Sequence, residues 1–126
     1  MNIMEHFHIS GVPVVDNNIL MGILTNRDIR FETNINLKVK DRMTAKSLVT
    51  VNKGTTLEEA KKVLQKHRIE KLLVVEDNGK LSGLITVKDI LKKENYPNAT
   101  IDKHGRLMVA AAVGTGTDVI RRADAL

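Results

Sequence analysis

Hydrophobic and polar positions follow the same order of predicted elements in two segments of the chain. In the more complete segment, the β-branched residues of 48–51 predict a short strand. After a turn at Lys53-Gly54, Thr56 and Glu59 match a capping box. In this motif the side chain of each residue accepts a hydrogen bond from the backbone N–H of the other. Apolar residues at helical spacing then predict a helix that runs to about His67.

The rest of this segment predicts a hairpin and a second helix. The apolar run 72–75 predicts a buried strand, and residues 81–86 predict the strand that returns beside it. Between them, Asp77-Asn78-Gly79 is a strong hairpin-turn signal. A helix over 86–93 completes a β-α-β-β-α unit.

The other segment predicts the same unit without its opening strand and most of its first helix. A polar connection, residues 32–44, joins it to the complete unit. We therefore expect the chain to be an excised or truncated piece. The expected elements are a helix at 3–8, a strand at 12–15, a turn at 16–18, a strand at 20–25 and a helix at 26–31.

The two segments form an internal repeat in sequence as well as in pattern. Residues 9–16 align with 69–76 at an offset of 60, and 21–29 align with 82–90 at an offset of 61, so the second copy has one extra turn residue. Both copies contain Gly, two apolar residues, Thr, two variable residues, Asp and Ile. Such a repeat predicts a duplicated structural unit.

Residues 96–126 predict a third region. Tyr96-Pro97-Asn98 ends the preceding helix, and residues 102–105 predict a turn. The apolar run 107–113 predicts a strand, followed by a Gly-rich loop at 114–118 and a helix from Val119. This order suits the opening of a larger α/β domain. Alone, it predicts an exposed, unpaired strand that favours self-association.

Composition excludes several classes of protein. The chain has 126 residues, is 42% hydrophobic and has three aromatic residues, so its core must be aliphatic. It contains no cysteine, which excludes disulfides, thiolate metal sites and a cysteine nucleophile on this chain. No apolar run has membrane-spanning length and no signal peptide precedes the repeats, so we expect a cytoplasmic protein and no membrane partner.

The net charge of +5 weakly favours anionic partners such as nucleotides or RNA. Aromatic residues that stack on bases are almost lacking, which argues against a nucleic-acid reader. The four histidines lack metal-ligand spacing, and Gly114 and Gly116 do not make a dinucleotide-binding fingerprint. Paired carboxylates, a Ser/His/Asp set and a Walker loop are absent from the sequence.

The repeated Thr-x-x-Asp motif, Thr25/Asp28 and Thr86/Asp89, carries the candidate chemistry. Helix capping explains the motif without any ligand, and a duplicated fold duplicates its caps. The alternative is that the helix N-termini bind phosphate while the aspartates accept hydrogen bonds from ribose hydroxyls. The sequence leaves both interpretations open.

Flanking residues extend this alternative. Arg27 and Lys88 either neutralise phosphate or are solvated surface cations. Gly11-Val12-Pro13 either exposes main-chain groups to an adenine edge or is a strand start that tolerates proline. In the second copy Lys71-Leu72-Leu73 stands in their place, so two sites built from these residues would not be equivalent.

The repeated residues resemble the cystathionine β-synthase (CBS) domain, whose pairs form nucleotide-sensing Bateman modules. The similarity is greatest to the CBS pair of bacterial inosine-5′-monophosphate (IMP) dehydrogenases. It is carried by residues 10–16, 22–28, 67–75 and 83–90, and residues 96–99 and 105–114 resemble the return of those chains to their (β/α)8 barrel.

The resemblance implies an α+β (mixed α/β) fold with tandem CBS domains, packed about a pseudo-two-fold axis, of which the first is incomplete at its N-terminus. The domains would be residues 1–33, residues 34–95 with the linker, and a barrel stub at 96–126. The family enzyme oxidises IMP with NAD on the pathway to guanine nucleotides, through a cysteine that this chain lacks. We therefore expect a non-catalytic regulatory module, with no cofactor or metal of its own.

The resemblance also implies a purine-nucleotide site. Its ligand would be ATP, ADP, AMP, GTP or GDP. The base would lie near Val12, Pro13 and Leu72, and the ribose hydroxyls on Asp28 and Asp89. Thr25 and Thr86 would lie near ribose and phosphate, Arg27 and Lys88 would face phosphates, and Thr44 would border one cleft.

Other functions remain open at this point. The chain could be an assembly module, a homodimer or larger oligomer, that binds no ligand. Weak binding to single-stranded nucleic acid would predict steep salt dependence. A catalytic role ranks last.

Overall fold

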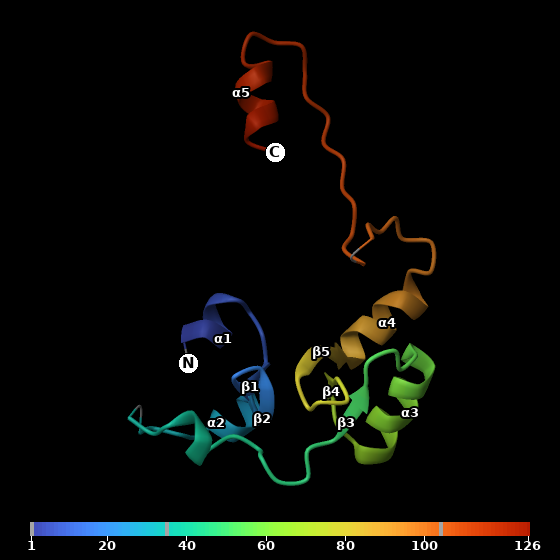
Figure 1. The fold of residues 1–126 in the computed structure, drawn as a ribbon. Helices are drawn as coiled ribbons and strands as arrows, with labels where there is room; N and C mark the ends of the chain where they lie inside the picture. Colours follow the sequence, from blue (N-terminus) through green and yellow to red (C-terminus); the bar gives the residue numbers. More distant parts are fainter. Residues whose placement is uncertain (1, 35, 104) are drawn as a thin grey trace. The chain divides into compact units, whose positions relative to one another are not determined.

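The computed structural model describes residues 2–34, 36–103 and 105–126. Two units can be distinguished along the chain, residues 1–92 and residues 93–126. Figure 1 shows the two repeats of the first unit as two small groups of helices and strands.

The first repeat is built around a β-hairpin. Strands β1 and β2 pair antiparallel, with Gly11 opposite Thr25. Asn17 and Asn18 join them with φ angles of 47° and 67°, values at which asparagine is tolerated in a tight hairpin turn. The predicted turn at 16–18 is confirmed. The elements are α1 (Asn2–His6), β1 (Gly11–Asp16), β2 (Ile19–Thr25) and α2 (Asn26–Ile29).

The second repeat has the predicted β-α-β-β-α order. Its sheet has the strand order β3-β4-β5, with β3 parallel to β4 and β4 antiparallel to β5. The opening strand begins two residues later than the predicted 48–51, because its pairing with β4 starts where Thr50 meets Leu73. The elements are β3 (Thr50–Asn52), α3 (Leu57–His67), β4 (Lys71–Val75), β5 (Leu81–Thr86) and α4 (Val87–Asn95).

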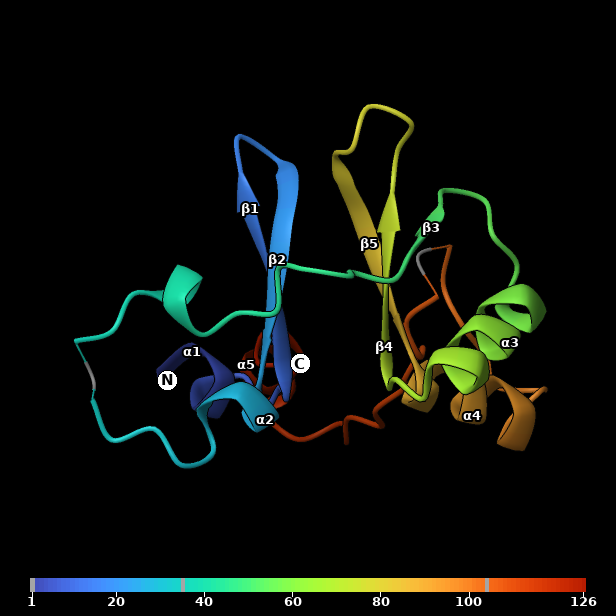
Figure 2. The same ribbon diagram turned by 90° about the horizontal axis from the view of Figure 1, so that it is seen from below.

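The main core lies where α3 and α4 pack on this sheet (Figure 2). Ala60 and Leu64 of α3, Leu72 of β4 and Ile90 of α4 are buried together. All four are aliphatic, as the composition requires. Half-buried residues surround them: Val49, Val51, Leu57, Val63, Ile69, Ile85 and Val87. Removing this apolar surface from water is the main stabilising term of the repeat.

The two hairpins meet at their tips through equivalent hydrogen bonds. The Leu20 N–H donates to the Gly79 carbonyl at 3.1 Å, and the Leu81 N–H donates to the Asn18 carbonyl at 2.9 Å. Each partner lies 61 residues from its counterpart. The contact therefore follows the pseudo-two-fold relation that the resemblance implies. Both hairpins also have a register shift at the same place, after Val14 and after Val74.

The connection between the repeats is tied back to the first hairpin. Ile23 and Thr44 exchange two main-chain hydrogen bonds of 2.9 Å each, which places Thr44 beside β2. Glu32, near the start of this connection, accepts a 2.6 Å hydrogen bond from Arg42 Nε, near its end. The pKa of Glu32 is lowered, first by a hydrogen bond from the Asn34 N–H and then by Arg42. A short 3-10 helix, η1 (Val39–Asp41), lies within the connection.

In residues 93–126, the predicted helix is confirmed and the predicted strand is wrong. Helix α5 spans Val119–Asp124. Over 107–113 the structure has a single bridge, Ile101 to Leu107, and no ladder among the described residues. A strand is stable only beside a partner, and Val109 is 93% exposed. The turn at 102–105 is present, with Gly105 donating to the Asp102 carbonyl, although His104 lies outside the described residues.

Candidate functional site: a cavity between the repeats

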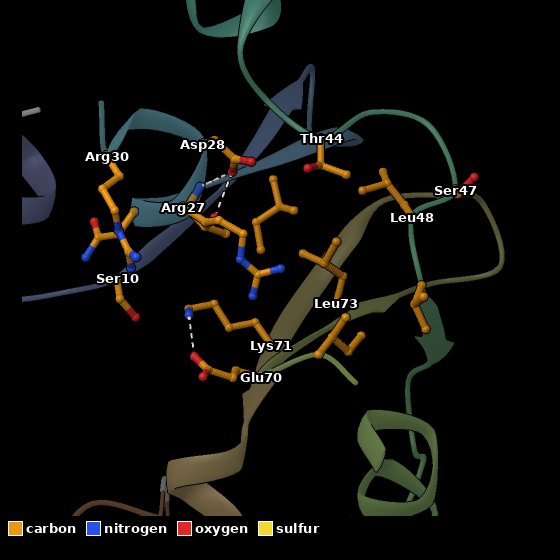
Figure 3. Close-up of a pocket in the computed structure, with 15 residues that line it drawn as sticks. Ser10, Arg27, Asp28, Arg30, Thr44, Ser47, Leu48, Glu70, Lys71 and Leu73 are labelled. Carbon is orange, nitrogen blue, oxygen red and sulfur yellow. Dashed lines mark hydrogen bonds and ion pairs between the residues drawn. The ribbon is translucent and has the colours of Figure 1, made fainter. Parts of the chain in front are cut away.

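A cavity of about 400 Å³ lies between the two repeats of the first unit (Figure 3). One wall comes from the end of β2 and from α2, and another comes from the residues that precede β3 and from β4 with the two residues before it. The lining residues are Ser10, Ile23, Thr25, Asn26, Arg27, Asp28, Arg30, Thr44, Ser47, Leu48, Val49, Ile69, Glu70, Lys71 and Leu73.

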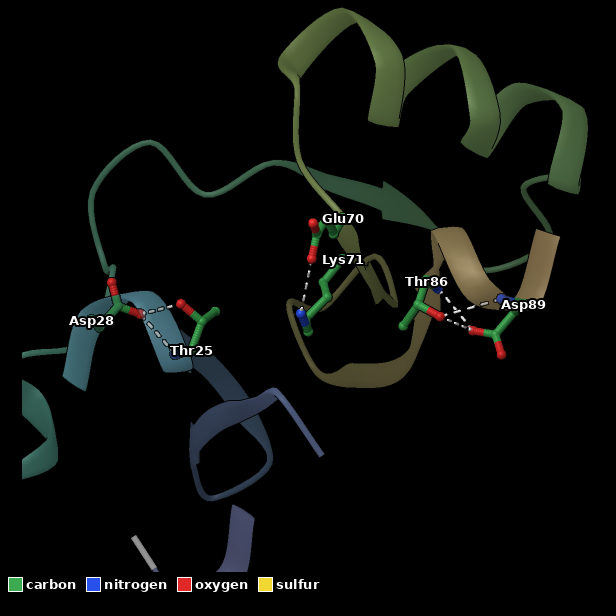
Figure 4. A network of polar contacts seen from close by, with 6 residues as sticks. All are labelled: Thr25, Asp28, Glu70, Lys71, Thr86 and Asp89. Carbon is green, nitrogen blue, oxygen red and sulfur yellow. Dashed lines mark hydrogen bonds and ion pairs between the residues drawn. The ribbon is translucent and has the colours of Figure 1, made fainter. Parts of the chain in front are cut away.

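Asp28 presents a carboxylate at the edge of this cavity. Its Oδ2 accepts hydrogen bonds from the Thr25 N–H at 2.7 Å and from the Thr25 hydroxyl at 2.8 Å (Figure 4). These bonds account for the Thr-x-x-Asp motif as a cap of α2. Oδ1 has no protein partner in the part of the chain that the structure describes. The cap therefore orients the carboxylate and leaves one oxygen for a ligand.

The second copy of the motif makes the same cap in a different setting. Asp89 Oδ2 accepts from the Thr86 N–H at 2.9 Å and from the Thr86 hydroxyl at 2.7 Å. Neither residue lines the cavity between the repeats. Lys88 lines another depression, of about 450 Å³, together with Met4, Glu5, His8 and residues near Ser10. The structure thus brings together Thr25, Arg27, Asp28 and Thr44 of the predicted site, and leaves Thr86, Lys88 and Asp89 apart from them.

Three cationic side chains line the cavity: Arg27, Arg30 and Lys71. In Figure 3 the Arg27 side chain points from α2 toward the Lys71 side. The Lys71 side chain is 14% exposed, and its ammonium lies 3.8 Å from a carboxylate oxygen of Glu70. The sequence interpretation missed Lys71 as a site residue. A lysine at the start of the apolar run Lys71–Val75 was the available signal.

Aliphatic side chains form the rest of the lining. Both Leu72 and Leu73 are buried, at 0% and 2% exposure, but Leu73 lines the cavity whereas Leu72 packs in the core cluster. Successive residues of a strand face opposite sides, so only one of this pair can reach the cavity. This placement corrects the expected contact of Leu72 with a base. Val12 and Pro13 are half-buried in β1, opposite Leu24 and Ile23, and do not line the cavity.

The cavity combines a free carboxylate oxygen, cationic side chains and apolar walls. Such a set suits a ligand that carries hydroxyl groups, an anionic group and a flat or apolar part. Among the residues that the structure describes, no group of His, Asp and Glu could hold a metal ion, and no helix is long and apolar enough to span a membrane.

The fold agrees with one family of domains. The CBS domain model matches residues 1–33 and 39–95, which is most of the chain. The chain belongs to the CBS domain family.

Among curated proteins, the chain is similar to IMP dehydrogenases. It is 52% identical over 124 residues to inosine-5′-monophosphate dehydrogenase of Bacillus subtilis, covering 96% of this chain and 25% of the enzyme. It is 54% identical over 127 residues to the enzyme of Staphylococcus aureus strain COL, covering 98% and 26%. The chain therefore spans about a quarter of the length of these relatives and matches their CBS region.

Solved structures give the same result. GMP reductase from Trypanosoma brucei in complex with guanosine 5′-triphosphate superimposes with a TM-score of 0.72 at 32% identity, covering 91% of this chain and 28% of that one. The CBS domain structure NE2398 superimposes with a TM-score of 0.64 at 27% identity, covering 75% and 77%. The α+β fold with tandem CBS repeats is confirmed.

Proposed function

We propose that the cavity between the repeats binds a purine nucleotide and that the chain is a regulatory, non-catalytic module of an IMP dehydrogenase. One observation carries the proposal. A single cavity is lined by a carboxylate oriented by its own helix cap, by Arg27 and Arg30 of the same repeat, and by Lys71 and aliphatic side chains of the other repeat. A ligand would then bridge the two repeats.

Each part of a nucleotide has a matching group. The ribose hydroxyls would donate to Asp28 Oδ1, whose partner oxygen is held by Thr25. The phosphates would lie near Arg27 and Lys71, since phosphate forms its strongest hydrogen bonds with charged donors. The base would pack on aliphatic side chains such as Val49 and Leu73, because no Phe or Tyr is among the described residues that line the cavity. A volume of about 400 Å³ falls in the usual range for small-molecule sites.

The similar proteins support this class of ligand. The GMP reductase structure mentioned above contains guanosine 5′-triphosphate, and the IMP dehydrogenases act on a purine nucleotide by name. These properties belong to those proteins. For this chain they favour a purine nucleotide over an unrelated anion, with adenine and guanine forms both to be tested.

A regulatory role requires that the nucleotide bind two states of the module with different affinity. The cavity spans both repeats, so a ligand there can change how they pack. Catalysis is assigned elsewhere in the longer relatives, because this chain contains no cysteine to act as the nucleophile that the family resemblance implies. NAD is therefore not a ligand of this chain in the proposal.

Calorimetric titration with ATP, ADP, AMP, GTP and IMP tests the proposal. We expect saturable binding of at least one nucleotide, and a loss of about tenfold or more in affinity for Asp28→Asn, since a hydrogen bond to a charged group is removed. Glu58→Gln, which neutralises an exposed carboxylate on α3, is the matched control and should bind like the parent chain. Absence of binding to the folded chain, or equal binding by Asp28→Asn, would refute the assignment.

Asp89→Asn determines the number of sites. If Thr86, Lys88 and Asp89 form a second site, as the resemblance implies, this variant lowers the stoichiometry and leaves the other site intact. If the cavity is the one nucleotide site, stoichiometry and affinity stay unchanged.

The exposed apolar segment of the second unit favours an assembly role as the alternative. Leu107, Met108 and Val109 are all exposed. Size-exclusion chromatography with and without nucleotide distinguishes the two functions. An oligomer that is equally stable in both conditions, together with no heat of binding, would favour assembly.

A further inference from the structure

The Lys71 side chain crosses from the second repeat toward the first. Figures 3 and 4 show it extending from β4 toward the side of Asp28. The Lys71 side chain is mostly buried, with 14% of it exposed, and its ammonium lies 3.8 Å from a carboxylate oxygen of Glu70. That carboxylate is itself 77% exposed, so water competes strongly for it. Because Glu70 neutralises the Lys71 ammonium only weakly, the ammonium can still bind an anionic group of a ligand in the cavity.

Gly11 makes room for the stem of this lysine. A Cβ at Gly11 would lie 2.7 Å from Lys71 Cδ and 2.8 Å from Lys71 Cε, closer than carbon atoms pack. Gly11 has no positive φ and pairs normally with Thr25 in β1. The strand conformation does not require glycine here. Glycine matters here because a side chain at position 11 would overlap Lys71 Cδ and Cε.

The two residues occupy equivalent positions of the repeat, 60 residues apart. They come into contact across the pseudo-two-fold relation, where equivalent positions face each other. A side chain at position 11 would overlap the stem of Lys71 where that stem now lies. Glycine at 11 thus leaves room for the stem of Lys71, which lines the same cavity as Asp28.

We propose that Lys71 makes this cavity selective for phosphorylated ligands, and that Gly11 is the positioning residue that holds the Lys71 ammonium there. The inference deepens the proposed nucleotide function and rests on it. Asp28 recognises the ribose in every nucleoside, whereas Lys71 interacts only with phosphate. The contribution of Lys71 therefore grows from adenosine to AMP, ADP and ATP, because each phosphate adds negative charge near the ammonium.

Two variants test the two residues separately. Lys71→Met keeps most of the stem and removes the charge. It should weaken binding of ATP by about tenfold to a hundredfold, the usual effect of losing a charged hydrogen bond. Gly11→Ala leaves the charge and displaces the stem. Because the atoms it meets belong to a flexible side chain, we expect the protein to stay folded and ATP binding to fall by about threefold to tenfold.

The double variant Gly11→Ala/Lys71→Met shows whether Gly11 acts through Lys71. It should bind ATP no more weakly than Lys71→Met alone, because the residue that Gly11 positions is already uncharged. Gly83→Ala is the matched glycine control, since its nearest neighbour, Val74 Cβ, would lie 4.0 Å from the new Cβ. Lys66→Met, at an exposed position of α3, is the matched charge control. Both controls should bind ATP like the parent chain.

The experiment is a set of titrations with adenosine, AMP, ADP and ATP, and with the guanine series if the parent chain prefers it. The proposal is supported if Lys71→Met and Gly11→Ala lose affinity in proportion to phosphate number while nucleoside binding changes less than about twofold. It is overturned if both variants bind ATP like the parent, or if the loss is the same for nucleoside and triphosphate. If the parent chain binds no nucleotide, the proposed function itself fails, which is a distinct result.

Discussion

Replacement of Leu72 by alanine gives the sharpest test of the core. Leu72 is 0% exposed and packs among Ala60, Leu64 and Ile90. The substitution removes three carbon atoms, each worth about 0.8 kcal/mol when buried. The surrounding side chains belong to a sheet and two helices and cannot fully collapse into the space, so a cavity term adds to this. We expect the free energy of unfolding to fall by about 3 kcal/mol, within the range for buried leucines.

Leu91→Ala on α4 is the matched control. Leu91 is 46% exposed and lies outside the core cluster, so the same chemical change should cost about 1 kcal/mol or less. Urea unfolding followed by far-ultraviolet circular dichroism is the assay. The chain has no tryptophan, and its one tyrosine, Tyr96, lies outside the first unit, so fluorescence would not report on this core.

The comparison of the two variants decides the result. If both lose the same small amount of stability with an unchanged m value, Leu72 does not lie in a closed core and the packing described above is wrong. A large loss for Leu72→Ala alone confirms it. Such a loss also agrees with Leu73, and not Leu72, lining the cavity.

Two further predictions concern the ends of α3. The pKa of Glu59 is lowered, first by the hydrogen bond from the Thr56 N–H and then by that from the Thr56 hydroxyl. The ionised form is thus favoured in the folded state, so this contribution is present above the unfolded-state pKa and is lost as the pH falls through the lower folded-state pKa. Glu59→Gln should flatten the acid side of the stability profile measured by thermal unfolding, and an unchanged profile would contradict the cap. At the other end, Arg68 has φ 52° and ψ 43°, a left-handed conformation that favours glycine. Arg68→Gly should raise the free energy of unfolding by about 1 kcal/mol in the same urea assay, with Lys66→Gly, inside the helix, expected to lower it.

The predictions that succeeded depend on short-range signals. The Thr56/Glu59 pattern predicted the start of α3, and the capping bonds are present at 2.9 Å. Asn17 and Asn18 predicted the first hairpin turn and adopt the left-handed conformation that the turn requires. In each case the interacting groups are within a few residues of one another, so the sequence contains the whole interaction.

The predictions that failed depend on partners far away in the chain. The apolar run 107–113 has the composition of a strand, but a strand also needs a neighbour to pair with, and the described residues provide one bridge. Leu72 and Leu73 have the same chemistry, and the sheet decides which of them faces the core. Lys71 was not predicted as a site residue, because its position depends on Gly11, 60 residues earlier.

The sequence by itself determined the duplicated unit, most of its elements and the two identical Thr-x-x-Asp caps, because repeated residues make repeated local hydrogen bonds. Only the tertiary structure decided that the cap of Asp28 borders the cavity between the repeats and that the cap of Asp89 does not. The physical reason is that the cavity is formed by side chains from both repeats. Where equivalent side chains of the two repeats differ, as at Gly11 and Lys71, the symmetry is broken. The Thr25/Asp28 motif then shares its cavity with the Lys71 ammonium, and the Thr86/Asp89 motif does not.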